Sequence, residues 1–189
     1  MGGMCTRHCQ PEYEEMVEES HGPTTYSIDR DSVFSSTRHI SDETGRVVFV
    51  KKTDRLGLHK ELFDATTNEV IWEHRSKQFL IHKRKYAYRR LPIKVTLSLE
   101  WGLHRTKYNF QWQGARYHWK NPSVFGADYQ CTADQSGEVL AEFKGNLLSR
   151  HVGSLTIYPL ARSMTGFPEL LIFSLIDLIE LQPNSVNSD

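Results

Sequence analysis

The residues with the strongest chemical character form one basic run, residues 82–90, with the sequence HKRKYAYRR. Five of these nine side chains are permanently positive, and two are tyrosines. In a chain of zero net charge, such a run creates a local positive field, and we expect it to attract anionic phospholipid or phosphoinositide head groups. Tyr86 and Tyr88 would then sit at the lipid boundary. The candidate lipid-binding residues are Lys83, Arg84, Lys85, Arg89 and Arg90.

Two other interpretations of the basic run stay open. The same composition suits RNA or DNA phosphates or a nuclear import signal. It also suits an ordinary loop or strand face whose charges are solvated. The whole chain has 23 Lys plus Arg and 23 Asp plus Glu, which gives no strong signal for nucleic-acid binding.

The first six residues, MGGMCT, match the pattern for N-myristoylation. Gly2 would carry the first acyl chain, and Cys5 is a candidate for palmitoylation. A single acyl chain binds membranes only marginally, whereas a second one makes the attachment stable. The alternative is an ordinary chain start without modification. Cys5, His8 and Cys9 lack the second ligand pair of a structural zinc site, so no metal site is predicted there.

No residue set specifies a reaction. The nine histidines form neither a His-x-x-x-His nor a His-Glu-x-x-His pair, and the sequence has no Gly-x-Ser-x-Gly nucleophile elbow and no phosphate-binding glycine loop. Cys131 lies in an expected strand without a recognised flanking motif, so we expect a buried, inert thiol. We therefore predict no catalytic residue, no cofactor and no metal ligand, and an enzyme would need a pocket assembled from distant strands.

The composition favours one domain in a reducing compartment. Three cysteines do not make a disulfide framework, no signal peptide is visible, and no window is long and apolar enough to span a membrane. We expect a cytoplasmic protein, peripheral at a membrane if the acylation and the basic run act together, with nuclear import as the alternative. The expected domain covers residues 24–182, between an acidic flexible tail at 1–23 and a disordered tail at 183–189.

A long apolar helix is expected near the end of the chain, at residues 168–181. Pro168 suits the first helical turn, and Glu169 favours the positive end of the helix dipole. Apolar residues then cover nearly every face, so the helix must be enclosed by protein. Asp177 and Glu180 lie on one side of it, where we expect water or an arginine to reach them.

Short alternating segments precede this helix, and turn-rich links separate them. About twelve such strands suit a closed antiparallel β-barrel, whose interior the helix would fill. The expected fold is therefore mainly β, a barrel around a hydrophobic C-terminal α-helix. The expected strands are residues 25–29, 36–40, 46–51, 61–64, 69–73, 78–82, 93–99, 108–112, 115–119, 127–131, 138–143 and 154–158.

This layout resembles the tubby C-terminal-like superfamily, which includes tubby domains, phospholipid scramblases and LURP-one-related proteins, and is most similar to fungal domains of unknown function in that superfamily. The resemblance rests on the aromatic hairpin FQWQGARYHW at 110–119, the strands VLAEF and LTIY, and the closing helix. It implies a barrel around a central helix. The phosphoinositide pocket of tubby domains has no residue-by-residue match here, and Asp128 and Asp134 are too isolated for the calcium loop of scramblases.

The sequence therefore favours a non-enzymatic intracellular binding module that associates with anionic phospholipid through the basic run. The alternative is a scaffold that binds a protein partner through exposed aromatic residues such as Trp101, Trp112 or Trp119.

Overall fold

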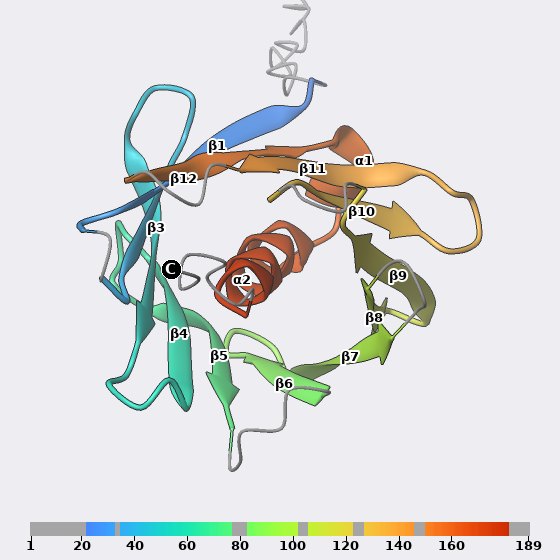
Figure 1. Ribbon diagram of the computed structural model, residues 1–189, viewed down its shortest axis with the longest axis horizontal. Helices are drawn as coiled ribbons and strands as arrows, with labels where there is room; N and C mark the ends of the chain where they lie inside the picture. Colours follow the sequence, from blue (N-terminus) through green and yellow to red (C-terminus); the bar gives the residue numbers. More distant parts are fainter. Residues whose placement is uncertain are drawn as a thin grey trace, which may run out of the picture.

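The computed structural model describes residues 22–32, 35–76, 83–101, 106–122, 127–145 and 150–181, apart from the side chains of Trp101 and Thr106. In these ranges, twelve antiparallel strands close into a barrel, and one long helix runs inside the ring of strands (Figure 1). The expected fold class is confirmed. No helix in the described part of the chain is long and apolar enough to cross a membrane.

The strands follow one another around the barrel in chain order, and β1 pairs with β12 to close it. Closure leaves no unpaired strand edge. A short helix, α1 (Pro159–Arg162), and the long helix α2 (Phe167–Ile179) follow the last strand. The strands are β1 (Thr24–Arg30), β2 (Arg38–Ser41), β3 (Val47–Thr53), β4 (His59–Asp64), β5 (Val70–Arg75), β6 (Lys83–Tyr88), β7 (Ile93–Trp101), β8 (Thr106–Trp112), β9 (Ala115–Lys120), β10 (Tyr129–Ala133), β11 (Val139–Gly145) and β12 (His151–Ile157).

The start of α2 depends on Gly166, which precedes the first helical residue with a φ of 78°. This left-handed conformation favours glycine. A Cβ atom at Gly166 would also lie 3.0 Å from the Cζ atom of Tyr88, a tight contact that the tyrosine ring would have to relieve. Pro168 then occupies the first turn, as expected from the sequence.

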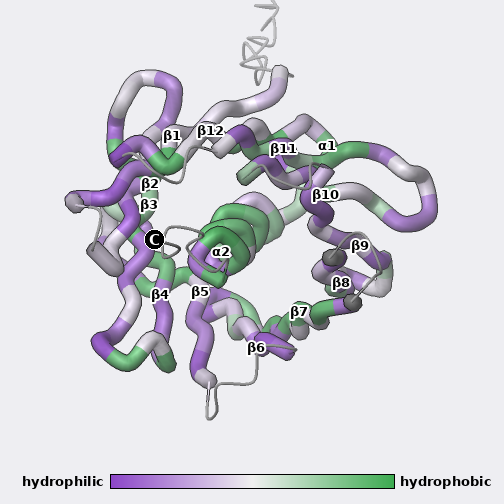
Figure 2. Tube along the Cα trace, viewed as in Figure 1, coloured by the Kyte–Doolittle hydropathy of each residue, from purple (hydrophilic) through white to green (hydrophobic). Residues whose placement is uncertain are grey.

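The helix α2 is buried on all sides. Every residue of α2 except Pro168 and Glu169 is buried, and the hydropathy colouring shows an apolar rod inside the ring of strands (Figure 2). Wall aromatics pack around it: the ring centroids of Tyr86 and Phe173 lie 5.4 Å apart, and those of Tyr117 and Phe167 lie 5.0 Å apart. The expectation that protein encloses this helix is confirmed.

Two wall tryptophans also bind the α2 region through their indole N–H groups. Trp119 donates to the Ser174 hydroxyl at 3.0 Å, and Trp72 donates to the Gly166 carbonyl at 3.3 Å. Trp112 and Trp119 are 2 % and 0 % exposed, so the expectation that these two residues form an exposed aromatic surface is wrong. Cys131 is a buried free thiol, as expected.

The strand boundaries differ from the expected ones in one place that matters for the site. The structure places β6 at Lys83–Tyr88, within the basic run, which was not among the expected strands. The expected strand at 78–82 and the expected tail after 182 lie outside the described residues. So do residues 1–21, which include the acylation candidates Gly2 and Cys5.

Candidate ligand-binding surface

The pleat of β6 divides the basic run between the two faces of the barrel wall. Successive side chains of a strand point to opposite faces. Lys83 and Lys85 are exposed on the outside, whereas Arg84, Tyr86 and Tyr88 point inward. Tyr86 and Tyr88 are 1 % and 6 % exposed, so the expectation that they sit at a lipid boundary is wrong.

Arg84 belongs to the barrel interior and does not contribute to the outer surface. Its Nη1 donates to Oδ2 of Asp177 at 2.6 Å, and the Tyr86 hydroxyl donates to the same oxygen at 2.8 Å. The Arg84 side chain is 13 % exposed and that of Asp177 is 0 % exposed. The buried carboxylate needs a positive partner, and Arg84 supplies it.

Arg84 is part of an interior charge cluster at the C-terminal end of α2. Lys60 contacts both helix carboxylates: it pairs with Asp177, and its Nζ lies 3.1 Å from Oε2 of Glu180. Lys51, which is fully buried, also pairs with Glu180. The expectation that an arginine reaches Asp177 is confirmed, but Asp177 itself is closed to water. The six members of the cluster are Arg38, Lys51, Lys60, Arg84, Asp177 and Glu180.

The charge states of this cluster follow from burial and from its neighbours. Burial alone would raise the pKa of Asp177, but Lys60 and Arg84 lower that pKa well below its usual range. Burial lowers the pKa of Lys51 to about 8, against the opposing attraction of Glu180. These ion pairs connect the C-terminal end of α2 to the strands of the barrel wall, so we assign the cluster a structural role.

Arg89 and Arg90 follow β6 in a turn and are exposed but paired. Nη2 of Arg89 donates to Oε2 of Glu73 at 2.6 Å, and Nη2 of Arg90 donates to Oδ2 of Asp64 at 3.2 Å. These carboxylates offset much of their charge. Lys83 and Lys85 are therefore the two expected lipid-binding residues whose charge is exposed and without a carboxylate partner in the described part of the chain.

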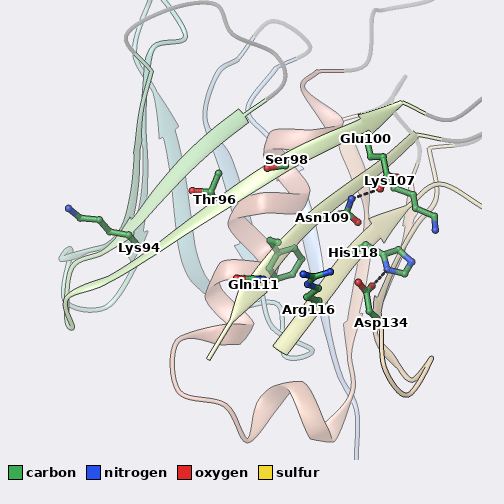
Figure 3. Close-up of a pocket in the computed structure, with 11 residues that line it drawn as sticks. Lys94, Thr96, Ser98, Glu100, Lys107, Asn109, Gln111, Arg116, His118 and Asp134 are labelled. Carbon is green, nitrogen blue, oxygen red and sulfur yellow. Dashed lines mark hydrogen bonds and ion pairs between the residues drawn. The ribbon is translucent and has the colours of Figure 1, made fainter. Parts of the chain in front are cut away.

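A polar groove of about 730 Å³ lies on the outer face of β7, β8 and β9 (Figure 3). Outward side chains of these three strands line it, together with the buried Phe110, and Asp134 lies just beyond β10 at its edge. The lining residues are Lys94, Thr96, Ser98, Glu100, Lys107, Asn109, Phe110, Gln111, Arg116, His118 and Asp134.

The strand register explains why the groove and the two lysines of β6 form one surface. Lys83 pairs with Ser98, and Lys85 pairs with Thr96. On the other side of β7, Ser98 pairs with Asn109. Paired residues of neighbouring antiparallel strands lie about 5 Å apart and point to the same face. The β6 lysines therefore stand beside the groove.

A second, smaller pocket of about 360 Å³ joins the groove to β5 and β6. Lys94 and Thr96 line both pockets, so the two are continuous across β7. Lys85 and Arg75 also line the smaller pocket. The hollowed surface thus extends from β5 to β9, and it is less polar toward β5 and β6, where Ala87 and Val95 line the smaller pocket.

Six cations stand on this surface, and we call them the basic face. In the described ranges, none of them has a carboxylate within ion-pair distance. Glu100 is opposite Lys107 in register but accepts a hydrogen bond from Asn109 at 2.7 Å instead. The members of the basic face are Lys83, Lys85, Lys94, Lys107, Arg116 and Lys120.

The groove contains one imidazole–carboxylate pair, in which Nδ1 of His118 lies 2.5 Å from Oδ1 of Asp134. Such a pair serves hydrolases when a hydroxyl nucleophile lies within hydrogen-bond reach of the imidazole. Here the register places Asn109 between Ser98 and His118, so β8 separates the Ser98 hydroxyl from the ring. Thr132 is directly opposite His118 on β10, but its buried hydroxyl makes no hydrogen bond to the ring. The arrangement suits the binding of an anion better than nucleophilic catalysis.

The comparisons with known proteins add information about the fold only. An X-ray structure of an Arabidopsis thaliana protein has a TM-score of 0.58 and 16 % sequence identity to this chain, and the match covers 85 % of this chain and 91 % of the other. At this identity the likeness shows a shared fold and no shared activity. No protein-family model matches the chain, and no curated protein matches it.

Proposed function

We propose that this protein is a non-enzymatic binding module that associates with anionic phospholipid through the basic face. The observation that carries this proposal is a group of six cations, from four neighbouring strands, on one outer surface of a chain whose net charge is zero. None of the six has a carboxylate partner among the residues that the structure describes. The barrel around a buried C-terminal helix supports a second part of the proposal, membership of the tubby C-terminal-like superfamily.

The charge state of the basic face favours an anionic surface. A cation already paired with a carboxylate must lose that partner before it can bind phosphate. The basic-face cations have no such partner among the described residues, so they bind phosphate without this cost. Each Lys or Arg near an anionic membrane contributes about 1 kcal/mol. Thr96, Ser98, Asn109 and Gln111 line the same groove and offer hydrogen bonds to phosphate oxygens.

The proposed lipid-binding set differs from the basic run of the sequence. Lys83 and Lys85 belong to both sets. Arg84 is not in the proposed set because its side chain points into the barrel. Arg89 and Arg90 are not in it because they pair with carboxylates. Acylation at Gly2 and Cys5 remains part of the proposal as a second attachment, because weak surface binding and an acyl chain reinforce each other. Mass spectrometry of the native N-terminal peptide tests the acylation directly. The proposed location is the cytoplasmic side of a membrane.

Vesicle co-sedimentation of the unacylated full chain tests the basic face. We expect binding to vesicles that contain phosphatidylserine or phosphoinositide, and little binding to pure phosphatidylcholine. The variant K85E/K94E/K107E should lose most of this binding. The matched control K52E/R55E/K144E also reverses cations, but these lie outside the basic face, and it should bind as the wild type does.

The outcome that contradicts the proposal is equal binding to anionic and neutral vesicles, or equal loss of binding in both variants. Binding to the anionic vesicles should also fall with added salt, since exposed charges are screened over about 8 Å at physiological ionic strength. Recovery of an acidic protein partner by the basic face, without vesicle binding, would replace the lipid by a protein ligand.

A further inference from the structure

Two carboxylates face each other on the outer side of the β4–β5 hairpin. Glu61 on β4 and Glu73 on β5 are directly paired in register. Like charges directly opposite each other destabilise a sheet. His59 lies two residues before Glu61, so it points to the same face of β4.

The three side chains converge at distances that are long for hydrogen bonds. Nε2 of His59 lies 3.4 Å from Oε1 of Glu61 and 4.0 Å from Oε2 of Glu73. One ligand atom from each of the three residues can be chosen so that all lie within 4.8 Å of one another. Two ligands bound at about 2.1 Å to one tetrahedral metal ion are about 3.4 Å apart, which is close to the shorter of these separations.

The imidazole nitrogen that faces the carboxylates has no other partner. The His59 side chain is 33 % exposed, but its Nε2 atom is buried and makes no hydrogen bond to the described residues. Lys52, which pairs with Glu61 from β3, holds its ammonium 4.6 Å from the centre of the Phe63 ring. Within the described ranges, His59 is thus the one basic group at ion-pair distance from Glu61.

Glu73 is held in place from its other side. Nη2 of Arg89 lies 2.6 Å from its Oε2 atom, and Nε of Arg75 lies 3.6 Å from the same atom. Such outer partners fix the orientation of a ligating carboxylate. They also offset part of its charge, so they weaken the attraction of Glu73 for a further cation.

From this geometry we infer that His59, Glu61 and Glu73 form a binding site for a divalent transition-metal ion, with Zn²⁺ as the best match. One imidazole and two carboxylates suit zinc better than magnesium or calcium, which prefer oxygen ligands alone. Three protein ligands leave the fourth tetrahedral position to water. Because the two arginines compete for Glu73, we expect micromolar affinity. The ion would join β4 to β5 at the edge of the smaller pocket, which Glu73 also lines.

The test is calorimetric titration of the EDTA-treated full chain with Zn²⁺ at pH 7.5. Cys5 and Cys9 are first changed to serine, because these thiols are possible zinc ligands outside the described residues. We expect one site, a rise in the unfolding temperature at saturating Zn²⁺, and no such rise with Mg²⁺. His59→Ala and Glu61→Gln should each weaken binding at least about tenfold, the loss of one ligand interaction of about 1.4 kcal/mol.

His39→Ala is the matched control, because His39 also lies on an outer strand face and bonds a single carboxylate, that of Asp31, at 2.9 Å. This variant should bind Zn²⁺ as the parent does. If His59→Ala does not fold, Glu61→Gln carries the same test. The inference is overturned if the parent shows no zinc binding in this titration, or if both variants bind as tightly as the His39→Ala control.

Discussion

Nη1 of Arg84 donates a 2.6 Å hydrogen bond to Oδ2 of Asp177, although 93 positions separate the two residues in the chain. The bond joins β6 of the barrel wall to the last turns of the enclosed helix. The bond also explains why Arg84, in the middle of a basic run, points into the barrel: its carboxylate partner, Asp177, is on α2.

Removal of the Asp177 carboxylate should destabilise the domain strongly. Asp177→Ala would leave Lys60 and Arg84 without their shared partner in the interior, and the loss of one member of a buried ion pair costs about 3–5 kcal/mol. Urea unfolding followed by tryptophan fluorescence measures the change. If the alanine variant does not fold, Asp177→Asn, which keeps the side-chain volume, should still show a lower unfolding midpoint.

The control for that experiment is Asp31→Ala, because Asp31 is 61 % exposed and pairs with a surface histidine. Its unfolding midpoint should match that of the wild type. Equal midpoints for Asp177→Asn and Asp31→Ala would contradict a structural role for the interior charge cluster.

The contribution of Lys51 to stability should rise between about pH 8 and 9.5. The pKa of this amine is about 8 in the folded protein, against an ordinary value of 10.5, mainly because the amine is buried. In this pH window Lys51 binds more protons in the unfolded chain than in the folded one, so it adds stability as the pH rises. Cys131 acts in the opposite direction, because burial raises the pKa of its thiol well above the ordinary value. Lys51→Met removes this titrating group, so the free energy of unfolding should change with pH by a less positive slope in the variant than in the wild type. Chemical denaturation of both proteins at pH 8, 8.75 and 9.5 measures the two slopes.

The window ends below pH 10 because the pKa of Tyr86 is raised, chiefly by burial, so ionisation of this residue above pH 10 favours the unfolded state. Identical slopes of unfolding free energy against pH for the wild type and Lys51→Met would show that Lys51 does not titrate in this window.

The central position of α2 predicts that a charge inside it unfolds the domain. Leu171 and Ile176 are 0 % and 1 % exposed, so Leu171→Asp or Ile176→Asp would bury an unpaired carboxylate. We expect loss of the cooperative thermal transition in circular dichroism. Leu160→Asp is the matched control, since Leu160 is 42 % exposed and should tolerate the charge. A folded Ile176→Asp variant would mean that α2 is not essential to the barrel.

Two neighbouring residues of β6 should respond in opposite ways. Lys85→Glu should weaken binding to anionic vesicles without changing stability, because Lys85 is exposed on the basic face. Arg84→Gln should lower stability by about 1–3 kcal/mol, the cost of a lost hydrogen bond to a buried charged group. Its vesicle binding should stay at the wild-type level in the folded fraction. Vesicle co-sedimentation and urea unfolding on both variants check this pair, and the reverse pattern would place Arg84 on the lipid surface.

The fold could be predicted because its strongest signal is local. The sequence from Leu170 to Leu178 is apolar on nearly every face, so the helix requires a surrounding wall, and the alternating segments before it supply that wall. The strand at β6 escaped prediction because charge masked its alternation. The signal was nevertheless present: Arg84, Tyr86 and Tyr88 share one face of a strand, and the two aromatics indicate that this face is the inner one.

The candidate site was predictable only in part. Lys83 and Lys85 follow from the basic run, but the other members of the basic face, Lys94, Lys107, Arg116 and Lys120, are spread over three further strands. Only the register between strands brings them together, and the register depends on turns and bulges that the sequence does not specify. For the same reason, the sequence does not show that His59 on β4 lies close to Glu73 on β5.

The pairing of β1 with β12 has a consequence for the time course of folding. Thr24 pairs with Ile157, so the last contact of the ring joins residues 133 positions apart. A large share of such distant contacts slows folding, because the chain must close long loops before any contact stabilises it. The helix α2, which fills the ring, follows β12 in the chain. During synthesis on the ribosome, all twelve strands therefore emerge before the helix that they enclose. Apolar wall residues then stay open to other chains until α2 emerges, and that interval is when this domain is most exposed to aggregation and most dependent on chaperones.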